Sequence, residues 1–360
     1  MSGLIIRTFA AMAKYKQKSR RKPSSWKKLQ LSKKIKHRLK ILGLALIVVF
    51  ATAVVSGAVA LYQFFAKPMA TAAGAADGDV TFPGGRFNLL LISLEDANES
   101  TSLITELSII TLDANEDEVF VVKLPLEAEV AVPQGFGGHQ LAEVYSLGAL
   151  TKPQANLDLT SQAVKKLLAV PIDGYVVTDD AGLGQIDKYL GDGWRMARLL
   201  PNFLTEVRRS IKTNLTFPSL LRVGQFIWSA RFGEDVWDIS EEELFDWQHL
   251  DLKLQGHFTD LKIIEERLKI QILNATEKSG LATHAARYVK NLGGDVIIIS
   301  NADQLDLKQS FMVTGDSETH TVKRLMEVLQ IEEVRSEFEG VGERADLTIV
   351  LGLDHVYRVR

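Results

Sequence analysis

The sequence ILGLALIVVFATAVVSGAVALYQFF, residues 41–65, separates the chain into a part before it and a part after it. It holds 25 consecutive residues without a formal charge. An α-helix of that length spans about 37 Å, which exceeds the roughly 30 Å hydrocarbon core of a bilayer. A buried core helix or a cleaved signal-peptide core of about 7–15 residues fits this length less well. The stretch therefore predicts an N-terminal single transmembrane helix.

The charge on the two sides of this stretch is unequal. Residues 1–40 carry 14 Lys and Arg side chains and no Asp or Glu, whereas the rest of the chain carries 28 basic against 45 acidic side chains. Short basic flanks remain on the cytoplasmic side of a membrane. We therefore expect a single-pass protein of the cell membrane, with a cytoplasmic tail over 1–40, extracytoplasmic domains after 65, and membrane lipid as a partner. Topology alone explains the basic tail, so no nucleic-acid partner is expected.

Composition narrows the class of protein further. The chain has 360 residues and no cysteine. That length predicts two or three folded units. The absence of cysteine argues against a small disulfide-stapled secreted fold and agrees with a bacterial envelope protein.

After a small-residue linker at 66–81, the first folded domain is expected over 82–250. Its pattern alternates between apolar runs and amphipathic segments, which predicts an α/β layered domain. Strands are expected at 87–94, 106–113, 119–125 and 172–180, and helices at 157–168, 181–190 and across most of 194–247. Ser240 followed by Glu243 begins a capping pattern for the last helix.

A polar connector is expected at 251–267, and a second domain at 268–357. The elements predicted there are strands at 269–275, 295–300, 309–314 and 345–354, with helices at 279–294 and 317–331. This β-α-β-β-α-β order predicts a small two-layer α/β domain.

Two parts of the chain resemble known families. The second domain resembles the LytR C-terminal domain, through ILNATEKSGLATHAARYVKNLGGDV (272–296) and DLTIVLGLDH (346–355). That domain commonly follows an LCP (LytR-CpsA-Psr) domain behind a basic tail and one membrane helix. Residues 86–180 resemble an LCP domain through FNLLLIS, ELSIITLDANEDEVFVVKLPLEAEV and VPIDGYVVTDD, and DGWRMARLLPNFL (192–204) resembles the opening of a later LCP helix.

The LCP resemblance implies an activity whose key residues are altered here. LCP proteins transfer glycan polymers from a polyprenyl-pyrophosphate carrier to peptidoglycan, using an Asp-Thr pair that helps to hold Mg²⁺ and a Pro-Arg-Asp turn whose Arg binds pyrophosphate. Thr105 and Glu106 stand at the Asp-Thr positions, and the turn reads Pro125-Leu126-Glu127. A family segment between residues 190 and 192 is also absent. A leucine cannot bind pyrophosphate as a guanidinium does, and Glu106 is expected to point away from Thr105 if the strand is regular.

The residues that survive permit two interpretations. Arg195 and Arg198 are three apart and share a helix face, so they are candidate phosphate ligands, with Asp192 as a candidate metal ligand. The other interpretation is that they are surface charges near a helix start, with Asp192 as the N-cap. Glu127 and Glu129 are either a relic carboxylate site or solvated strand-end residues.

Other motifs are weaker. Asp179 and Asp180 form either a cation site or a turn, and the turn between Asn274 and Gly280 offers amides to an anion but lacks the pattern of a P-loop. The seven histidines show no metal-ligand spacing.

The sequence therefore predicts a non-catalytic LCP-like binding or scaffold protein in cell-wall assembly. The alternative is a divergent LCP phosphotransferase moving glycopolymer from polyprenyl pyrophosphate to peptidoglycan. No cofactor is expected, with Mg²⁺ required only by the alternative. Polyprenyl-linked glycan or peptidoglycan is the expected partner.

Overall fold

The computed structural model describes residues 82–151, 155–180, 211–338 and 344–359, all within one compact unit, Tyr62–Arg360. Within those ranges no helix combines the length and the apolar character needed to cross a membrane. The membrane helix predicted at 41–65 and the helix predicted at 181–190 lie outside the described residues.

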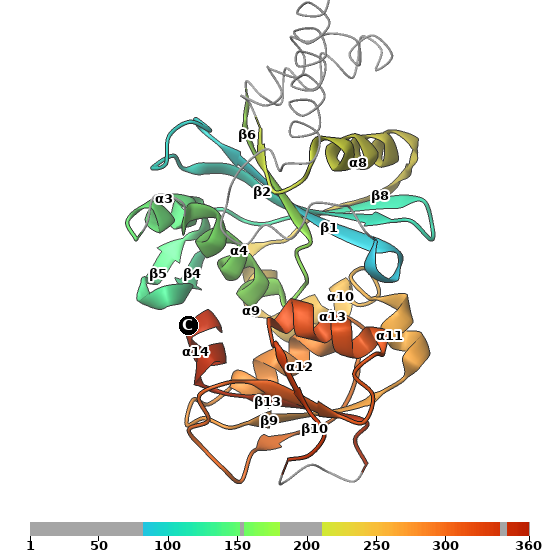
Figure 1. Ribbon diagram of the computed structural model, residues 1–360. Helices are drawn as coiled ribbons and strands as arrows, with labels where there is room; N and C mark the ends of the chain where they lie inside the picture. Colours follow the sequence, from blue (N-terminus) through green and yellow to red (C-terminus); the bar gives the residue numbers. More distant parts are fainter. Residues whose placement is uncertain (1–81, 152–154, 181–210, 339–343, 360) are drawn as a thin grey trace, which may run out of the picture. The chain divides into compact units, whose positions relative to one another are not determined.

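The first domain is built on a six-stranded mixed sheet with the order β7-β6-β1-β2-β3-β8 (Figure 1). β1 is antiparallel to β2 and parallel to β6, and β8 is parallel to β3. The strands are β1 (Arg86–Leu94), β2 (Ile104–Asp113), β3 (Glu118–Lys123), β6 (Gly174–Asp179), β7 (Lys212–Thr213) and β8 (Arg231–Asp238).

Helices cover both faces of this sheet, which explains why β1 is apolar almost throughout (Figure 1). Leu90 and Ile92 of β1 pack in a cluster with helix α4 (Ala155–Leu168). Phe87 and Leu89 belong to the cluster on the other face, which includes helix α8 (Phe217–Ser229). The predicted mixed α/β layers are therefore present.

Short elements that the sequence did not predict lie before β1 and between β3 and α4. They are η1 (Pro83–Gly85), β4 (Glu129–Val132), η2 (Pro133–Gly135), β5 (Gly137–Gln140), η3 (Leu141–Glu143) and α3 (Val144–Ala149). β4 and β5 pair as a two-stranded hairpin.

The prediction of a mostly helical segment over 194–247 is confirmed only in part for its described residues, where α8 and α9 are helical. β7 and β8 lie within it, and β8 forms because the outer edge of β3 offers free backbone groups. The predicted cap is present: the Ser240 hydroxyl accepts from the Glu243 amide, and the Glu243 carboxylate accepts from the Ser240 amide. The helix is nevertheless interrupted at Asp246, giving α9 (Glu241–Phe245) and α10 (Trp247–Leu254).

The prediction of a polar connector at 251–267 is wrong. The segment contains the end of α10 and the helix α11 (Leu261–Glu266). Leu254, Phe258 and Ile263 are buried, so the apolar minority of this segment decides its structure.

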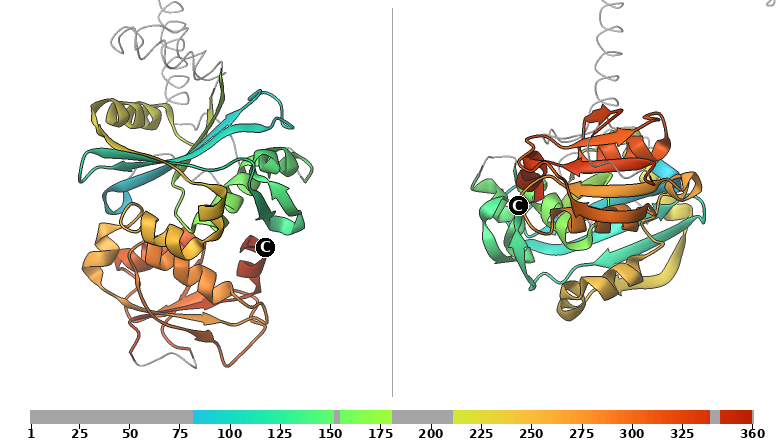
Figure 2. Two further views of the ribbon diagram at one scale, coloured as in Figure 1. Left: turned by 180° about the vertical axis from the view of Figure 1, so that it is seen from behind. Right: turned by 90° about the horizontal axis from the view of Figure 1, so that it is seen from below.

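The second domain has a five-stranded sheet with the order β10-β9-β13-β11-β12. Helices α12 (Leu281–Asn291) and α13 (His320–Leu329) lie on one face, as two views show (Figure 1; Figure 2). The predicted strands and helices are present, but β12 and the terminal helix α14 (Leu353–Val359) were not predicted. The strands are β9 (Lys269–Asn274), β10 (Asp295–Asn301), β11 (Phe311–Thr314), β12 (Glu333–Arg335) and β13 (Leu347–Leu351).

Candidate functional site

An open cavity lies where β2 begins and where β3 and β8 end. β3 is antiparallel to β2 and parallel to β8, so these three strand ends meet at one edge of the sheet. The loop after β3 and the start of α9 complete the wall. The cavity has a volume of about 550 Å³, and its lining residues fall in the three segments Thr105–Leu107, Lys123–Glu127 and Asp238–Glu241.

This cavity brings together the two pairs of residues that the LCP resemblance singled out. Thr105 and Glu106 line it from β2, and Leu126 and Glu127 line it from the loop after β3. The expectation that Glu106 points away from Thr105 is wrong. Ser93 pairs with Glu106 while Leu94 pairs with Ile104, so Thr105 is an extra residue in a β-bulge and the regular alternation of side chains is lost there.

The cavity is acidic. Its described lining carries four carboxylates, from Glu106, Glu127, Asp238 and Glu241, and one cationic group, the ammonium of Lys123. That ammonium lies 3.0 Å from Glu106 Oε1, so an ion pair already engages it. Like charges in a shared site disfavour each other, and the cavity wall therefore repels a pyrophosphate group.

The same residues do not fit a magnesium site. Mg²⁺ needs convergent oxygen ligands in octahedral geometry. Among the described residues no three Asp, Glu, His or Cys side chains come together in a way that could hold a metal ion. Thr105 offers a hydroxyl where the family has a carboxylate.

The other predicted site residues are dispersed. Asp192, Arg195 and Arg198 lie outside the described residues. Glu129 is exposed and pairs with Gln140 in the β4–β5 hairpin, so it takes no part in the cavity lining given above. Asp179 accepts a hydrogen bond from the Ala97 amide at 3.2 Å.

Asn274 has a structural role at the end of β9. Its Oδ1 accepts from the Thr276 amide at 3.1 Å, and its Nδ2 donates to the Lys278 carbonyl at 2.8 Å. Gly280 follows with a φ of 83°, a left-handed conformation suited to glycine. The Asn and Gly of this motif therefore shape the strand-to-helix turn.

Sequence reasoning missed three residues of the cavity lining, Asp238, Ser240 and Glu241, because it did not predict β8. It also missed Lys123, although Lys123 stands two residues before the altered turn. If the sequence had placed the end of β8 next to the Pro125-Leu126-Glu127 turn, it would have predicted that Lys123 and the residues after β8 line this cavity.

Comparison with known proteins identifies the second domain. Residues 267–355 match the family model described as LytR cell envelope-related transcriptional attenuator. These residues form a LytR C-terminal domain. The sequence prediction for this part of the chain is therefore confirmed. Among curated proteins, none matches the chain in sequence.

Several solved structures are similar to part of the chain. They include TagT bound to LI-WTA, with 15% identity, a TM-score of 0.34, and coverage of 51% of this chain and 98% of that one. YwtF (TagT) with bound octaprenyl pyrophosphate lipid, described as a LytR-CPS2A-psr family protein, has 16% identity, a TM-score of 0.32, and coverage of 51% and 98%. TagV of B. subtilis has 15% identity, a TM-score of 0.33, and coverage of 47% and 97%. Similarity at this level assigns no activity to the present chain.

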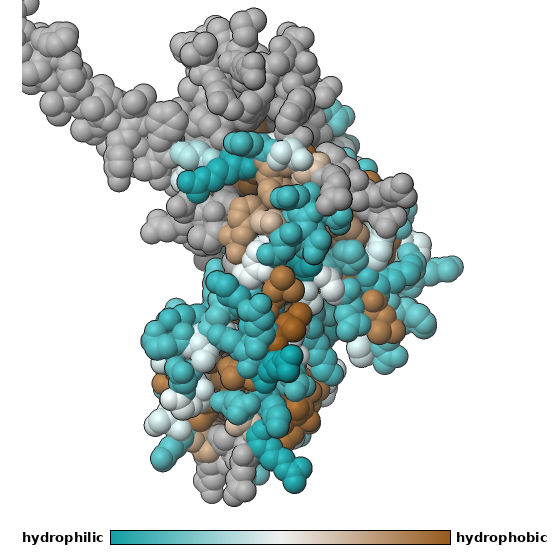
Figure 3. All heavy atoms as spheres, turned by 90° about the vertical axis from the view of Figure 1, so that its right-hand side faces the viewer, coloured by the Kyte–Doolittle hydropathy of each residue, from teal (hydrophilic) through white to brown (hydrophobic). Residues whose placement is uncertain are grey.

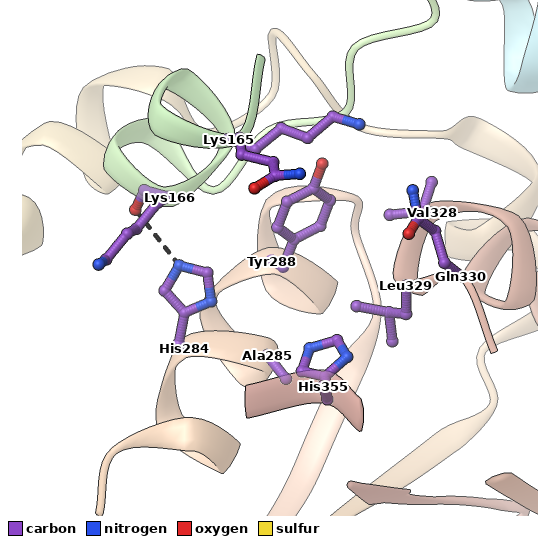
Figure 4. Close-up of a pocket in the computed structure, with 10 residues that line it drawn as sticks. Lys165, Lys166, His284, Ala285, Tyr288, Val328, Leu329, Gln330 and His355 are labelled. Carbon is purple, nitrogen blue, oxygen red and sulfur yellow. Dashed lines mark hydrogen bonds between the residues drawn. The ribbon is translucent and has the colours of Figure 1, made fainter. Parts of the chain in front are cut away.

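The LytR C-terminal domain docks on the end of helix α4. His284, Tyr288 and Asn291 lie on one face of α12, because they are spaced by four and three residues. His284 Nε2 lies 3.3 Å from the Lys166 carbonyl oxygen (Figure 4). Tyr288 donates to the Val170 carbonyl at 2.6 Å. Asn291 Nδ2 lies 3.2 and 3.1 Å from the carbonyl oxygens of residues 168 and 169. Side chains of α12 thus contact carbonyl groups in the last turn of α4, which a helix end leaves without partners, and carbonyl groups of the two residues that follow it.

A buried ion pair also joins the LytR C-terminal domain to the first domain. Arg324, which is 5% exposed, lies 2.5 Å from Asp173 Oδ1 and 2.9 Å from Glu327 Oε2. Burial by itself lowers the pKa of Arg324, but the two carboxylates outweigh it and raise the pKa above its ordinary value. Burial lowers the pKa of the neighbouring Lys165.

The cavity beside the contact between α12 and the end of α4 is small. Lys165, Lys166, His284 and Tyr288 line it, and its volume is about 100 Å³ (Figure 4). That space suits a few ordered waters rather than a lipid or a glycan. The contact between α12 and α4 is therefore a docking interface.

Proposed function

We propose that this chain is a membrane-anchored, extracytoplasmic protein of the bacterial cell envelope. The LytR C-terminal domain supports this proposal, because its family model carries a cell-envelope description. The uncharged stretch at 41–65 and the basic tail before it support the anchor and its orientation. In this proposal residues 82–250 are an LCP-like domain and residues 268–357 the LytR C-terminal domain.

The LCP-like domain is proposed to bind or scaffold rather than to catalyse. The observation that carries this is the acidic cavity, where Leu126 stands in place of the family's Arg and the Lys123 ammonium is paired with Glu106. Carboxylates accept hydrogen bonds from hydroxyl and amino groups. A lipid-linked glycan or peptidoglycan would then be held through its sugars and not through a pyrophosphate.

The test uses the full chain in lipid nanodiscs with a labelled polyprenyl-pyrophosphate glycan, peptidoglycan and Mg²⁺. We expect the glycan to bind equally well with Mg²⁺ or with a chelator, and no label to reach peptidoglycan. Binding that requires Mg²⁺, or any transfer of label, would overturn the scaffold role.

A divergent phosphotransferase is the second candidate. The three-residue spacing of Arg195 and Arg198 favours it, because two guanidinium groups on one helix face can hold one phosphate group. This function predicts Mg²⁺-dependent transfer that is lost in the Arg195→Ala/Arg198→Ala double variant. A chain that neither binds nor transfers the glycan would contradict both candidates.

A further inference from the structure

Unpaired polar groups at a cavity indicate a ligand more strongly than exposed apolar groups do. On the face shown in Figure 3, hydrophobic side chains reach the surface in patches between hydrophilic ones. Large apolar side chains scattered over a surface need no explanation. The large majority of buried polar side-chain atoms, in contrast, have a hydrogen-bond partner, so each exception needs an explanation.

A polar cavity of this kind lies between the two domains. Helix α4 and the start of β6 line it from the first domain, and helices α12 and α13 line it from the LytR C-terminal domain. Its volume is about 220 Å³. It adjoins the smaller cavity described above and shares Lys165 and Tyr288 with it. The larger volume leaves room for a small organic molecule as well as for water.

Helix α4 presents three polar side chains to this cavity, those of Asp158, Ser161 and Lys165. They are spaced by three and four residues, so they lie on one face of the helix. All three residues are half-buried. Among the described residues, none forms a hydrogen bond or a close ion pair with the Asp158 carboxylate or the Lys165 ammonium. The cavity therefore holds two opposite charges that lack direct partners.

Burial disfavours the charge on both of these side chains. It raises the pKa of Asp158, although Lys165 opposes this shift. It lowers the pKa of Lys165, although Asp173 opposes this shift. Each charged group has thus lost water without gaining a full replacement for it. A ligand that brings a partner to each group would recover this cost.

The Tyr175 hydroxyl is a third unused group. Tyr175 lines the cavity from β6, and its hydroxyl is buried without a hydrogen-bond partner among the described residues. Burial raises the pKa of Tyr175 to about 12, so the hydroxyl stays protonated and can donate. A buried donor at a cavity wall indicates an acceptor inside the cavity.

The charges of the cavity favour a zwitterion. An anion would meet Asp158 and Glu327 as well as Lys165, and a cation would meet Lys165 as well as the carboxylates. Asp173 and Arg324 line the same cavity, but these two groups already engage each other. A neutral ligand would leave both Asp158 and Lys165 without a counter-charge. A molecule that carries both charges gives each of the two side chains a partner.

One part of the wall is apolar. Leu157, Ile172 and Val328 contribute to the lining. Methylene groups of a ligand can pack on these side chains and leave water. The cavity therefore suits a molecule with charged ends and a short hydrocarbon middle.

We propose that this cavity binds a small zwitterion whose ammonium and carboxylate are separated by a few methylene groups, the class of ω-amino acids. Asp158 and Lys165 are seven residues apart, so their backbones are about 10 Å apart along the helix. The ligand ammonium pairs with Asp158, and the ligand carboxylate pairs with Lys165 and accepts from the Tyr175 hydroxyl. This goes beyond the function proposed above, because the cavity shares no lining residue with the acidic cavity.

The experiment titrates the full chain in nanodiscs with γ-aminobutyrate at neutral pH by isothermal titration calorimetry, with empty nanodiscs as the blank. Butyrate and butylamine have the same carbon chain but carry one charge each, so they are the matched control ligands. We expect saturable binding of γ-aminobutyrate and about tenfold weaker binding of each control ligand, since each lacks one ion pair.

Two variants assign the two ion pairs. Lys165→Met removes the ammonium but keeps a long side chain, so it should bind γ-aminobutyrate about as weakly as butylamine. Asp158→Asn removes the carboxylate charge, so it should bind γ-aminobutyrate about as weakly as butyrate. Lys166→Met is the matched control, because Lys166 is also half-buried but does not line this cavity. It should bind like the original chain.

Three results would overturn the proposal, provided that thermal unfolding shows each variant to be folded. They are the absence of saturable γ-aminobutyrate binding up to about 10 mM, equally tight binding of butyrate or butylamine, and equal losses in Lys165→Met and Lys166→Met. A chain that binds γ-aminobutyrate but fails the lipid-linked glycan test would support this inference and contradict the proposed function.

Discussion

The hydroxyl group of Tyr288 donates a hydrogen bond to the carbonyl oxygen of Val170 at 2.6 Å, joining the LytR C-terminal domain to the end of α4. Burial raises the pKa of Tyr288 far above its ordinary value, so the hydroxyl remains protonated and able to donate. Both groups are buried. Loss of this hydrogen bond would leave the carbonyl group without a donor and would lower the free energy of unfolding.

Tyr288→Phe should lower the free energy of unfolding by about 1–2 kcal/mol, since it leaves a buried carbonyl without this donor. Urea unfolding followed by circular dichroism measures the change. Tyr175→Phe is the matched control, because the Tyr175 hydroxyl is buried and has no hydrogen-bond partner among the described residues. If both variants lose the same free energy of unfolding, the hydrogen bond of Tyr288 does not contribute to stability.

Asp173→Asn should destabilise the protein by roughly 3 kcal/mol, because it leaves the buried Arg324 charge poorly compensated. Glu327→Gln removes another of the three carboxylates around Arg324, the third being Asp260 at 3.9 Å, but Glu327 is 64% exposed, so its loss should cost less than about 1 kcal/mol. Chemical denaturation of both variants tests the difference. Equal losses of unfolding free energy would show that burial does not make the Asp173–Arg324 ion pair more important for stability than the exposed Glu327 pair.

The stability of the docked domains should fall in mild acid. The pKa of His284 lies below its ordinary value because burial disfavours the charged imidazolium, although its contact with the Lys166 carbonyl opposes this. Below about pH 6.5 the unfolded chain therefore binds a proton that the folded chain does not, and the free energy of unfolding decreases as the pH falls.

His284→Gln keeps an N–H donor but removes the titrating group. It should show a smaller loss of stability between about pH 7.5 and about pH 5.5 than the original chain. An unchanged pH dependence in His284→Gln would assign the effect to other groups.

Leu126→Arg should introduce anion binding into the acidic cavity. A guanidinium at this position would face the cavity wall, and inorganic pyrophosphate should bind about tenfold more tightly than to the original chain. Leu150→Arg, at a residue that is 73% exposed and outside the lining, controls for added charge. Calorimetry with pyrophosphate measures the affinities. Equal affinities in the two variants would mean that the side chain at position 126 does not control anion binding in this cavity.

Local patterns predicted much of the fold. The uninterrupted apolar run of β1 indicated a central strand covered on both faces, and Ser240 with Glu243 predicted a cap that the structure contains. The LytR C-terminal domain was predictable because Asn274 and Gly280 shape one turn within a few residues of each other.

Other features depend on contacts between residues that are far apart in the sequence. β8 has few apolar residues and is a strand because β3 offers it an edge. The bulge at Thr105 depends on the pairing of β1 with β2, so the strand period could not place Glu106 correctly. The cavity at Asp158 joins α4 to β6, α12 and α13, and no local motif links these segments.

The partners of the α4 carbonyl groups have a consequence for the order of folding. His284, Tyr288 and Asn291 follow the carbonyl groups that they contact by 118 to 123 residues. During synthesis α4 therefore emerges long before the groups that complete it. The first domain can form its sheet early, but the last turn of this helix must wait for the final quarter of the chain to arrive.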